Sequence, residues 1–491
     1  MNAVKTLEQL QDHPVLRIFR SITEIPRASK EEARIGEWIM EFARQHGWTY
    51  RRDDIGNVLV VVPATPGHES KASVCLQAHL DMVCLDDQGN AYGDERFPLQ
   101  LRLEDGWLKA IGTTLGADNG IGVALALAIG AEGEHGPLEL LFTVQEETGL
   151  DGAASLEFKL ESKVLLNLDS EDWKMLFIGC AGGCGITVDV EVQYQHVADT
   201  AKTWILGVSG LQGGHSGLEI NKGRQNAVRV LAEAIAGMNF HQQIQLVELS
   251  GGSRSNAIPA SARAIFVANG NVDRLQDLFS TVSSTLTTVY DADEPAMQFL
   301  LVATDDPVPQ AASSAVTRQL LALIQELPHG VISMSPILDV PQTSVNLGVA
   351  RLGVSTQKLS LTLMGRSSDA AELEQLKVQI QDVCWGFFEG DDSVRSSVTY
   401  GEGYPGWQPE PDAPLVQTVQ RVWQQQRADP LLVTAIHAGL ECGLLKGKYP
   451  DIEMVSLGPD IRGAHSAEER VSLASVEECY LFLQSLLKSL A

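Results

Sequence analysis

Apolar residues follow two alternating patterns along the first third of the chain. Residues 30–46 place them at helical spacing and stop before Gly47, which predicts an amphipathic helix. Short runs rich in β-branched and apolar residues predict strands, and a longer apolar run at 119–131 predicts a buried helix. Strands and helices that alternate over short connections indicate an α/β layered domain. The predicted strands span 55–62, 74–78, 138–145 and 163–168.

The end of the chain continues in the same style. Residues 453–458 predict another strand. Ser475 and Glu478 form the S-x-x-E pattern of a capping box, which predicts the start of a final helix. The apolar residues from Val476 to Leu490 fall on one face of that helix.

The middle of the chain differs from both ends. From about 186 to 399, alternating apolar and polar residues predict further strands, and helical stretches intervene at 222–238 and 313–326. The simplest organisation is a catalytic domain built from residues 1–185 and 400–491. An inserted domain at 186–399 would interrupt it.

Composition and charge indicate a globular protein and disfavour nucleic acid and membranes as partners. The 491 residues are 44% hydrophobic and 20% charged, which is typical of a globular chain with two or more domains. The formal net charge of −27 disfavours nucleic acid and membranes as partners. No segment resembles a signal peptide or has about eighteen consecutive apolar residues, so no membrane span is expected.

The seven cysteines are an odd number and are thinly spread. This pattern favours a reducing compartment over a disulfide framework, so we expect a cytoplasmic protein. Cys180 and Cys184 form C-x3-C, but no second pair follows at zinc-finger spacing, and no structural zinc is expected there.

Histidine and acidic residues stand where several predicted strands end. One further segment, GTTLGADNGIG, places its aspartate in a glycine-rich turn before the buried helix. Ligand sites in open α/β sheets form outside the carboxyl ends of the strands, so these separate segments can converge on one place. The candidates are His79, Asp81, Asp118, Glu146, Glu147 and Asp169, with His465 after the strand near the end of the chain.

The residue types indicate a hydrolytic metal site. Imidazole and carboxylate ligands without thiolate suit zinc, manganese or cobalt. A pair of ions needs a shared ligand, and Asp118, isolated from other acids and flanked by glycines, is the candidate that bridges them. His79 and Asp169 would complete the protein ligands of one ion, and Glu147 and His465 those of the other.

Glu146 and Glu147 are adjacent and unsuited to one shared role, because consecutive strand residues point to opposite sides. We assign Glu147 to a metal ion. Glu146 is assigned as the general base that takes a proton from a metal-bound water and passes it to the leaving amine. Asp81 would orient the imidazole of His79. Each residue alone has a structural explanation, such as a surface acid pair or a helix cap, but five such segments together favour a catalytic site.

The order of these residues resembles the dinuclear-zinc exopeptidases that include carboxypeptidase G, succinyl-diaminopimelate desuccinylase and carnosinase. The shared pattern is H-x-D, a glycine-flanked Asp, E-E, Asp and a late His. Longer strings, among them QAHLDMV, GADNGIG, FTVQEETGLDG, LQGGHSG and HAGLECG, resemble the aminoacyl-histidine (Xaa-His) dipeptidase branch. The resemblance implies a zinc-exopeptidase-like three-layer α/β catalytic domain with an inserted α+β lid and dimerisation domain. It also implies two zinc ions on the five ligands above, and a cis peptide bond after Asp118.

The same resemblance assigns roles in the middle of the chain. His215, in GGHSG, would stabilise the oxyanion of the tetrahedral intermediate, and because relatives often supply this residue from a partner subunit, a homodimer is expected. Arg366 would bind the terminal carboxylate of a small peptide substrate, and Asn256 would contact the same substrate. The chain departs from the family at Ser255, where relatives usually have Arg; here Arg254 stands one position earlier.

The HAGLECG segment brings two further polar residues close in sequence. His437 and Glu441 are four residues apart, so on a helix they would share one face and could bind metal. Since the metal ligands are already assigned, we expect this segment to form the floor of the pocket. Gly439 would then lie near the substrate backbone.

Together these features predict a metallodipeptidase that hydrolyses unblocked dipeptides and prefers Xaa-His, by Glu-assisted attack of a metal-bridging water. The alternative is a hydrolase of N-acyl amino acids, of the aminoacylase or desuccinylase type, which the metal ligands alone do not exclude. A second alternative is a metal-dependent binding protein that has lost activity. Such a protein would lack one of the metal ligands or the general base, and this sequence has all of them. Aminopeptidases of related fold share E-E and the late His but lack the inserted lid with GGHSG.

Overall fold

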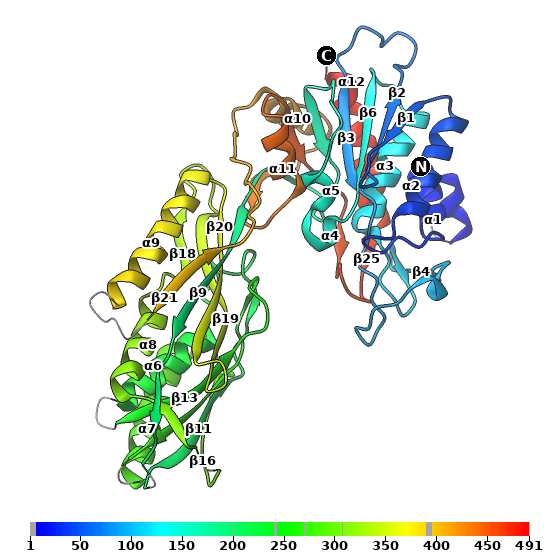
Figure 1. The fold of residues 1–491 in the computed structure, drawn as a ribbon. Helices are drawn as coiled ribbons and strands as arrows, with labels where there is room; N and C mark the ends of the chain where they lie inside the picture. The colour runs from blue at the N-terminus through cyan, green and yellow to red at the C-terminus, as the bar shows by residue number, and fades with distance from the viewer. Residues whose placement is uncertain are drawn as a thin grey trace. The chain divides into compact units, whose positions relative to one another are not determined.

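The chain folds into two compact units (Figure 1). The first comprises Met1–Cys180, Trp407–Ala435 and Leu440–Ala491, and the second comprises Ala181–Gly406 and Ile436–Gly439. The first unit therefore draws on both ends of the chain. The role of 186–399 as a lid and dimerisation domain stays a prediction. The computed structural model describes residues 6–198, 200–239, 243–269, 272–306, 308–388 and 395–490.

A mixed sheet forms the centre of the first unit. Strands β6, β3, β7 and β23 are neighbours in it and run parallel. Because parallel strands end at the same edge of a sheet, the segments that follow β3, β6 and β7 meet there. The strands, in sheet order, are β1 (Thr49–Arg52), β2 (Val58–Val62), β6 (Leu138–Thr143), β3 (Val74–His79), β7 (Val164–Asn167), β23 (Glu453–Ser456), β8 (Met175–Cys180) and β22 (Leu432–Ile436).

Helices pack around this sheet. α3 (Ala117–Glu132) contacts β3 and β6 and is buried along most of its length, as its nearly continuous apolar sequence predicts. α1 and α12 pack against α3, and α11 contacts β8 and β23. The strands and helices predicted for both ends of the chain are present, although the strand at 138–145 ends earlier and the last helix starts earlier than predicted. The other helices are α1 (Pro14–Ile22), α2 (Ala33–Gln45), α4 (Glu146–Gly149), α5 (Asp151–Ala154), α10 (Pro414–Gln426), α11 (Glu441–Lys448) and α12 (Leu473–Ser489).

The start of the last helix differs from the predicted capping box. The cap is Ser472, whose side chain accepts a hydrogen bond from the backbone N–H of Ser475 at 3.4 Å. Ser475 itself is buried inside the helix, and Glu478 accepts a hydrogen bond from the indole of Trp173. The prediction was wrong because a short strand, β25 (Arg470–Ser472), runs directly into the helix and starts it earlier.

The second unit is built on an antiparallel sheet. Helices α6, α7, α8 and α9 lie along one side of it (Figure 1), and an apolar core that includes Trp204 and Phe266 fills the space between. α6 (Ala227–Asn239) and α8 (Ser314–Glu326) confirm two predicted helices. The remaining helices are α7 (Val272–Tyr290) and α9 (Ala370–Phe388). The strands, in sheet order, are β16 (Gln298–Thr304), β11 (Lys202–Ser209), β15 (Ala262–Ala268), β13 (Ile244–Gly251), β19 (Pro341–Gly353), β20 (Lys358–Ser367), β9 (Gly182–Glu191) and β21 (Ser396–Tyr400), with β18 (Gly330–Met334) beside β19.

The two units confirm the predicted fold class. The first combines parallel strands with helices, as expected of an α/β domain, and the second combines an antiparallel sheet with helices on one side, as expected of an α+β domain. Among the described residues, no helix is both long enough and apolar enough to span a bilayer.

Candidate metal centre

Three predicted ligands meet at the edge of the sheet in the first unit. His79 ends β3, Asp118 lies at the start of α3, and Asp169 follows β7. Nε2 of His79 lies 3.0 Å from Oδ1 of Asp118 and 3.2 Å from Oδ1 of Asp169. One imidazole and two carboxylates at this separation can hold one cation.

A second group shares Asp118 with the first. Its Oδ2 lies 3.3 Å from Nε2 of His465, and Oε2 of Glu147 lies 2.8 Å from the same nitrogen. Asp118 thus contributes one oxygen to each group, which is the arrangement of a carboxylate that bridges two ions. The peptide bond between Asp118 and Asn119 is cis, as the resemblance implied.

Glu146 and Glu147 lie on a short helix rather than at the end of a strand. β6 stops at Thr143, Gln145 takes a left-handed conformation with φ of 57°, and α4 begins at Glu146. The strand predicted to reach residue 145 was therefore too long, because Gln145 turns the chain. As a result, the two glutamates do not point to opposite sides, and both come close to His79.

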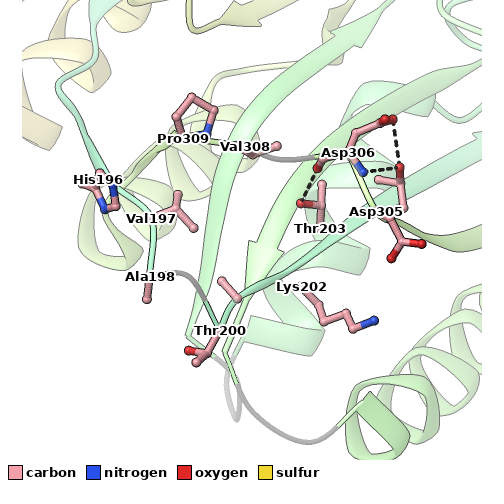
Figure 2. Close-up of a pocket in the computed structure, with 12 residues that line it drawn as sticks. His196, Val197, Ala198, Thr200, Lys202, Thr203, Asp305, Asp306, Val308 and Pro309 are labelled. Carbon is pink, nitrogen blue, oxygen red and sulfur yellow. Dashed lines mark hydrogen bonds between the residues drawn. The ribbon is translucent and has the colours of Figure 1, made fainter.

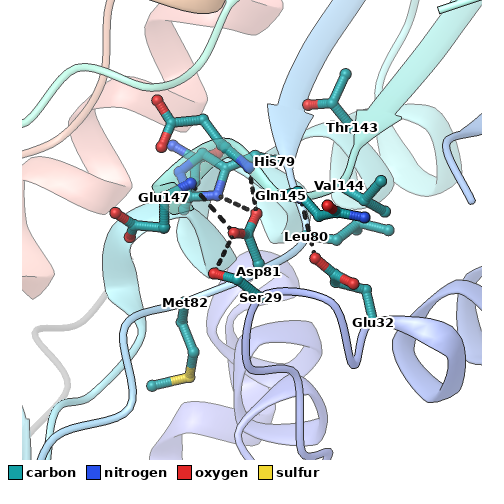
Figure 3. A network of polar contacts seen from close by, with 12 residues as sticks. Ser29, Glu32, His79, Leu80, Asp81, Met82, Thr143, Val144, Gln145 and Glu147 are labelled. Carbon is teal, nitrogen blue, oxygen red and sulfur yellow. Dashed lines mark hydrogen bonds and ion pairs between the residues drawn. The ribbon is translucent and has the colours of Figure 1, made fainter. Parts of the chain in front are cut away.

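Asp81 joins His79 to this turn (Figure 3). Its Oδ1 accepts a hydrogen bond from the backbone N–H of Glu146 at 3.0 Å, and its Oδ2 accepts one from that of Glu147 at 3.1 Å. The hydroxyl of Ser29 donates to Oδ2 at 2.7 Å, and Nδ1 of His79 lies 3.4 Å from Oδ1. A carboxylate fixed in this way holds both the imidazole and the turn in place.

The centre contains more buried acid than its histidines can neutralise. Burial raises the pKa of Glu146 well above its usual range, that of Asp169 to about 6 and that of Glu171 to about 8, and nearby carboxylates add to each shift. Burial disfavours charge on His79, but the surrounding carboxylates, chiefly Asp169, raise its pKa overall. Buried charges are normally paired or coordinate metal ions. The donor set therefore fits divalent cations.

Two buried side chains that the sequence did not single out hold the loops of this centre. Glu469 accepts hydrogen bonds from three backbone N–H groups in residues 115–118, at 2.7, 2.9 and 3.1 Å. Arg27 donates to the carbonyls of residues 80 and 81 at 2.9 and 3.0 Å. Because both side chains contact backbone far away in sequence, no local motif marks them.

The predicted residues from the middle of the chain all lie in the second unit. His215, on the two-residue strand β12 (Gly214–His215), lies beside Asn256, whose carbonyl accepts a hydrogen bond from the backbone N–H of Ser216 at 2.9 Å. Arg366 is buried, and its Nε donates to the hydroxyl of Ser216 at 3.4 Å. Ser216 therefore connects the neighbourhoods of His215, Asn256 and Arg366.

The HAGLECG segment does not form a single helix. Nε2 of His437 lies 2.7 Å from the hydroxyl of Ser344 in the second unit, whereas Glu441 begins α11 in the first. The two residues share no helix face, because the backbone just before Glu441 is extended. Gly439 lies against Tyr404, where a Cβ would come within 2.9 Å of the ring.

A pocket of about 500 Å³ in the second unit contains none of the predicted site residues (Figure 2). Its lining includes His196, Lys202 and Asp305. The hydroxyl of Thr203 donates to the carbonyl of Asp306 at 3.3 Å at its edge. The candidate site therefore remains the metal centre of the first unit.

Comparison with known proteins decides the family. The model of peptidase family M20/M25/M40 matches residues 75–489. The chain belongs to this peptidase family. It is 36% identical to the cytosol non-specific dipeptidase of Escherichia coli (strain K12) over 493 residues, which cover 99% of each protein.

Solved structures agree with this assignment. The aminoacylhistidine dipeptidase from Vibrio alginolyticus matches with a TM-score of 0.88 and 33% identity, over 99% of this chain and 98% of that one. Aminopeptidase PepT from Bacillus cereus shares the fold, with a TM-score of 0.58 and 15% identity over 97% and 98% of the two chains. The resemblance seen in the sequence is confirmed, and the chain is an enzyme of the M20 peptidases.

Proposed function

We propose that this M20 peptidase hydrolyses unblocked dipeptides with two divalent metal ions. The observation that supports this most strongly is that Asp118 belongs to both ligand groups, while the carboxylate of Glu146 lies close to His79 and Glu147. We propose zinc in both positions, with manganese and cobalt as the other metals that suit nitrogen and oxygen ligands. The remaining ligands would be His79 and Asp169 for one ion, and Glu147 and His465 for the other.

The chain's own acids would move the proton. When bound, the two ions would lower the pKa of a coordinated water and polarise the scissile carbonyl. Glu146 would take the proton of the attacking water and pass it to the nitrogen of the leaving amine. Asp81 would keep Glu146 and the ring of His79 in place through its hydrogen bond to the turn and its contact with Nδ1.

His215 would donate a hydrogen bond to the oxyanion that forms at the carbonyl carbon. Its Nδ1 accepts hydrogen bonds from the backbone N–H groups of Gly217 and Leu218, both at 3.2 Å, so the proton of a neutral ring resides on Nε2. Burial, with help from Arg366, lowers the pKa of His215 and favours that neutral ring. Nε2–H is thus the donor that we assign to the oxyanion.

Three other residues of the second unit would bind the peptide. The guanidinium of Arg366 is held by the hydroxyl of Tyr404 at 2.9 Å, and we assign it to the terminal carboxylate, which an Arg can bind through two hydrogen bonds. Asn256 would contact the peptide beside it. Gly439 would leave space for the backbone of the substrate.

We further propose that residues 186–399 act as a lid that closes on the substrate and as the interface of a homodimer. The Escherichia coli relative is named a cytosol dipeptidase, which supports a cytoplasmic location. Light scattering should give the mass of two chains. Mixing the inactive variants His215→Ala and Glu146→Ala would restore activity only if His215 serves the site of the other copy.

The deciding experiment is hydrolysis of Gly-His, β-Ala-His, Gly-Leu and N-acetyl-Leu by the zinc-loaded protein, with Glu146→Ala as the matched variant. Cleavage of the free dipeptides that disappears in Glu146→Ala supports the proposal. Faster cleavage of Gly-His than of Gly-Leu would support the preference for Xaa-His, and equal rates would indicate a broad dipeptidase. Cleavage of N-acetyl-Leu alone would instead identify an N-acyl amino acid hydrolase, and intact substrates throughout would overturn the proposal.

A further inference from the structure

A set of buried polar side chains links three strands beneath the metal centre. Oε2 of Glu441 accepts hydrogen bonds from Nε2 of Gln77 at 2.6 Å and from the hydroxyl of Thr143 at 2.7 Å. Oε1 of Gln77 accepts one from Nδ2 of Asn167 at 2.6 Å. We call these four residues the Glu441 network.

The strand residues of the network are close in sequence to the proposed metal centre. Glu441 itself comes from the start of α11, which follows the second unit along the chain. Residues two apart on a strand share a face, so the network lies on the side of the sheet from which the ligands project. Gln77 is two residues before His79, Thr143 is three before Glu146, and Asn167 is two before Asp169, whose N–H donates to Oδ1 of Asn167 at 3.3 Å.

Burying the four polar side chains of the network costs free energy of desolvation. All four of its side chains are fully buried, with 0% exposure, so bulk solvent does not reach them. Oε1 of Glu441 has no hydrogen-bond partner within the described chain, and burial raises the pKa of this carboxyl to about 7. Apolar side chains of similar size would avoid these desolvation costs. Polar groups add directional contacts, because their hydrogen bonds hold side chains of three neighbouring strands in one arrangement.

We propose that Glu441 is a positioning residue for the metal centre. The backbone ladder already fixes the spacing of β3, β6 and β7. Through Gln77, Thr143 and Asn167, Glu441 instead braces the carboxyl ends of these strands, and with them the orientation of the ligands that follow. The inference rests on the proposed function, because it takes those residues as metal ligands. In this role Glu441 touches neither the substrate nor the ions.

The test compares two substitutions of Glu441 with a matched control. Glu441→Leu removes both acceptor oxygens, whereas Glu441→Gln keeps a carbonyl oxygen for the donors of Gln77 and Thr143. The control is Glu139→Leu, which removes another buried carboxylate of β6, one that accepts from the backbone N–H groups of Glu161 and Ser162 away from the ligands.

Zinc affinity is measured by competition with a chromophoric chelator, without any substrate. We expect Glu441→Leu to weaken zinc binding by about 10-fold or more, as loss of a supporting partner does in metal sites. Glu441→Gln and Glu139→Leu should bind zinc like the wild type, even where their thermal stability is lower. In the zinc-saturated protein, Glu441→Leu should lower kcat and leave KM nearly unchanged.

Several results would overturn the inference. Wild-type zinc affinity in Glu441→Leu would do so, and so would an equal loss in Glu139→Leu, since that would be general destabilisation. A raised KM with unchanged kcat and zinc affinity would mean that Glu441 contacts the substrate instead. Should Glu441→Leu fail to fold, Asn167→Ala, which interrupts the same network, decides in the same assay. If the wild type binds no zinc, the proposed function itself falls.

Discussion

The two units place the predicted site residues in opposite electrostatic settings. In the first unit, burial and neighbouring carboxylates raise the pKa of Glu146 and Asp169. Negative charge there is therefore not fully balanced by nearby cationic side chains. In the second, burial and the nearby Arg366 lower the pKa of His215, and they lower that of His437 to about 4. The first setting suits cations, and the second offers neutral and cationic donors to a carbonyl or carboxylate. Substitutions in the first unit should therefore change metal content, and those in the second should change substrate handling.

The largest effect is expected for Asp118→Ala in the first unit. Loss of the carboxylate shared by both ligand groups should release both ions and lower kcat/KM for a dipeptide by about 10³-fold or more. Elemental analysis of the metal-to-protein ratio and a hydrolysis assay measure this. Asp305→Ala, an acid of the second unit's pocket, serves as the control. If Asp118→Ala kept two ions, the assignment of metal binding to the first unit would be contradicted.

His215→Ala should affect activity without affecting metal content. Removal of one donor to an oxyanion costs about 10²–10³-fold in kcat. The metal-to-protein ratio should stay at the wild-type value, because His215 belongs to the second unit. A variant that loses metal together with activity would mean that the division of roles between the units is false.

Acid should destabilise the second unit through His437. Its pKa is about 4 in the folded chain, against 6.5 for an ordinary histidine, so below pH 6.5 the unfolded chain binds the proton first. The contribution of neutral His437 to the unfolding free energy is fully present above pH 6.5. It is lost as the pH drops toward 4, by up to about 3 kcal/mol. His437→Gln should flatten the pH dependence of the unfolding free energy in urea. The exposed His196→Gln should leave it unchanged, and equal slopes in all three proteins would refute the prediction.

Replacing the serines that cap helices should give the smallest effects on stability, and these effects should be equal in the two units. Ser472 caps α12 in the first unit, and Ser313 caps α8 in the second by accepting from the backbone N–H of Val316 at 3.1 Å. Replacing either with Ala should lower the unfolding free energy by about 1 kcal/mol. Ser485→Ala, in the C-terminal half of α12 and away from its cap, is the control. A change in metal content in either cap variant would contradict a purely local role.

Local patterns predicted much of the fold and the set of candidate ligands. The strand pattern at 74–78 and the buried helix pattern at 119–131 were correct, because burial on both faces requires continuous apolar residues. His79 and Asp169 could be expected together, since parallel strands end at one edge of a sheet.

The supports of the centre could not be predicted in this way. Arg27 and Glu469 act on backbone groups far along the chain, so their role depends on the completed fold. The left-handed turn at Gln145 has no glycine to mark it. Glu441 was noticed beside His437, but periodicity could not reveal that the chain passes from one unit to the other between them.

The split of the first unit also orders events in time. His465 and Glu469 are synthesised after the whole second unit, whereas His79, Asp118 and Asp169 leave the ribosome before it. On the proposed ligand set, a growing chain can offer one group of ligands before the second unit is made but completes the other only after it. Hydrolysis would then require both parts of the first unit, so a chain broken off within the second unit would not become an uncontrolled peptidase.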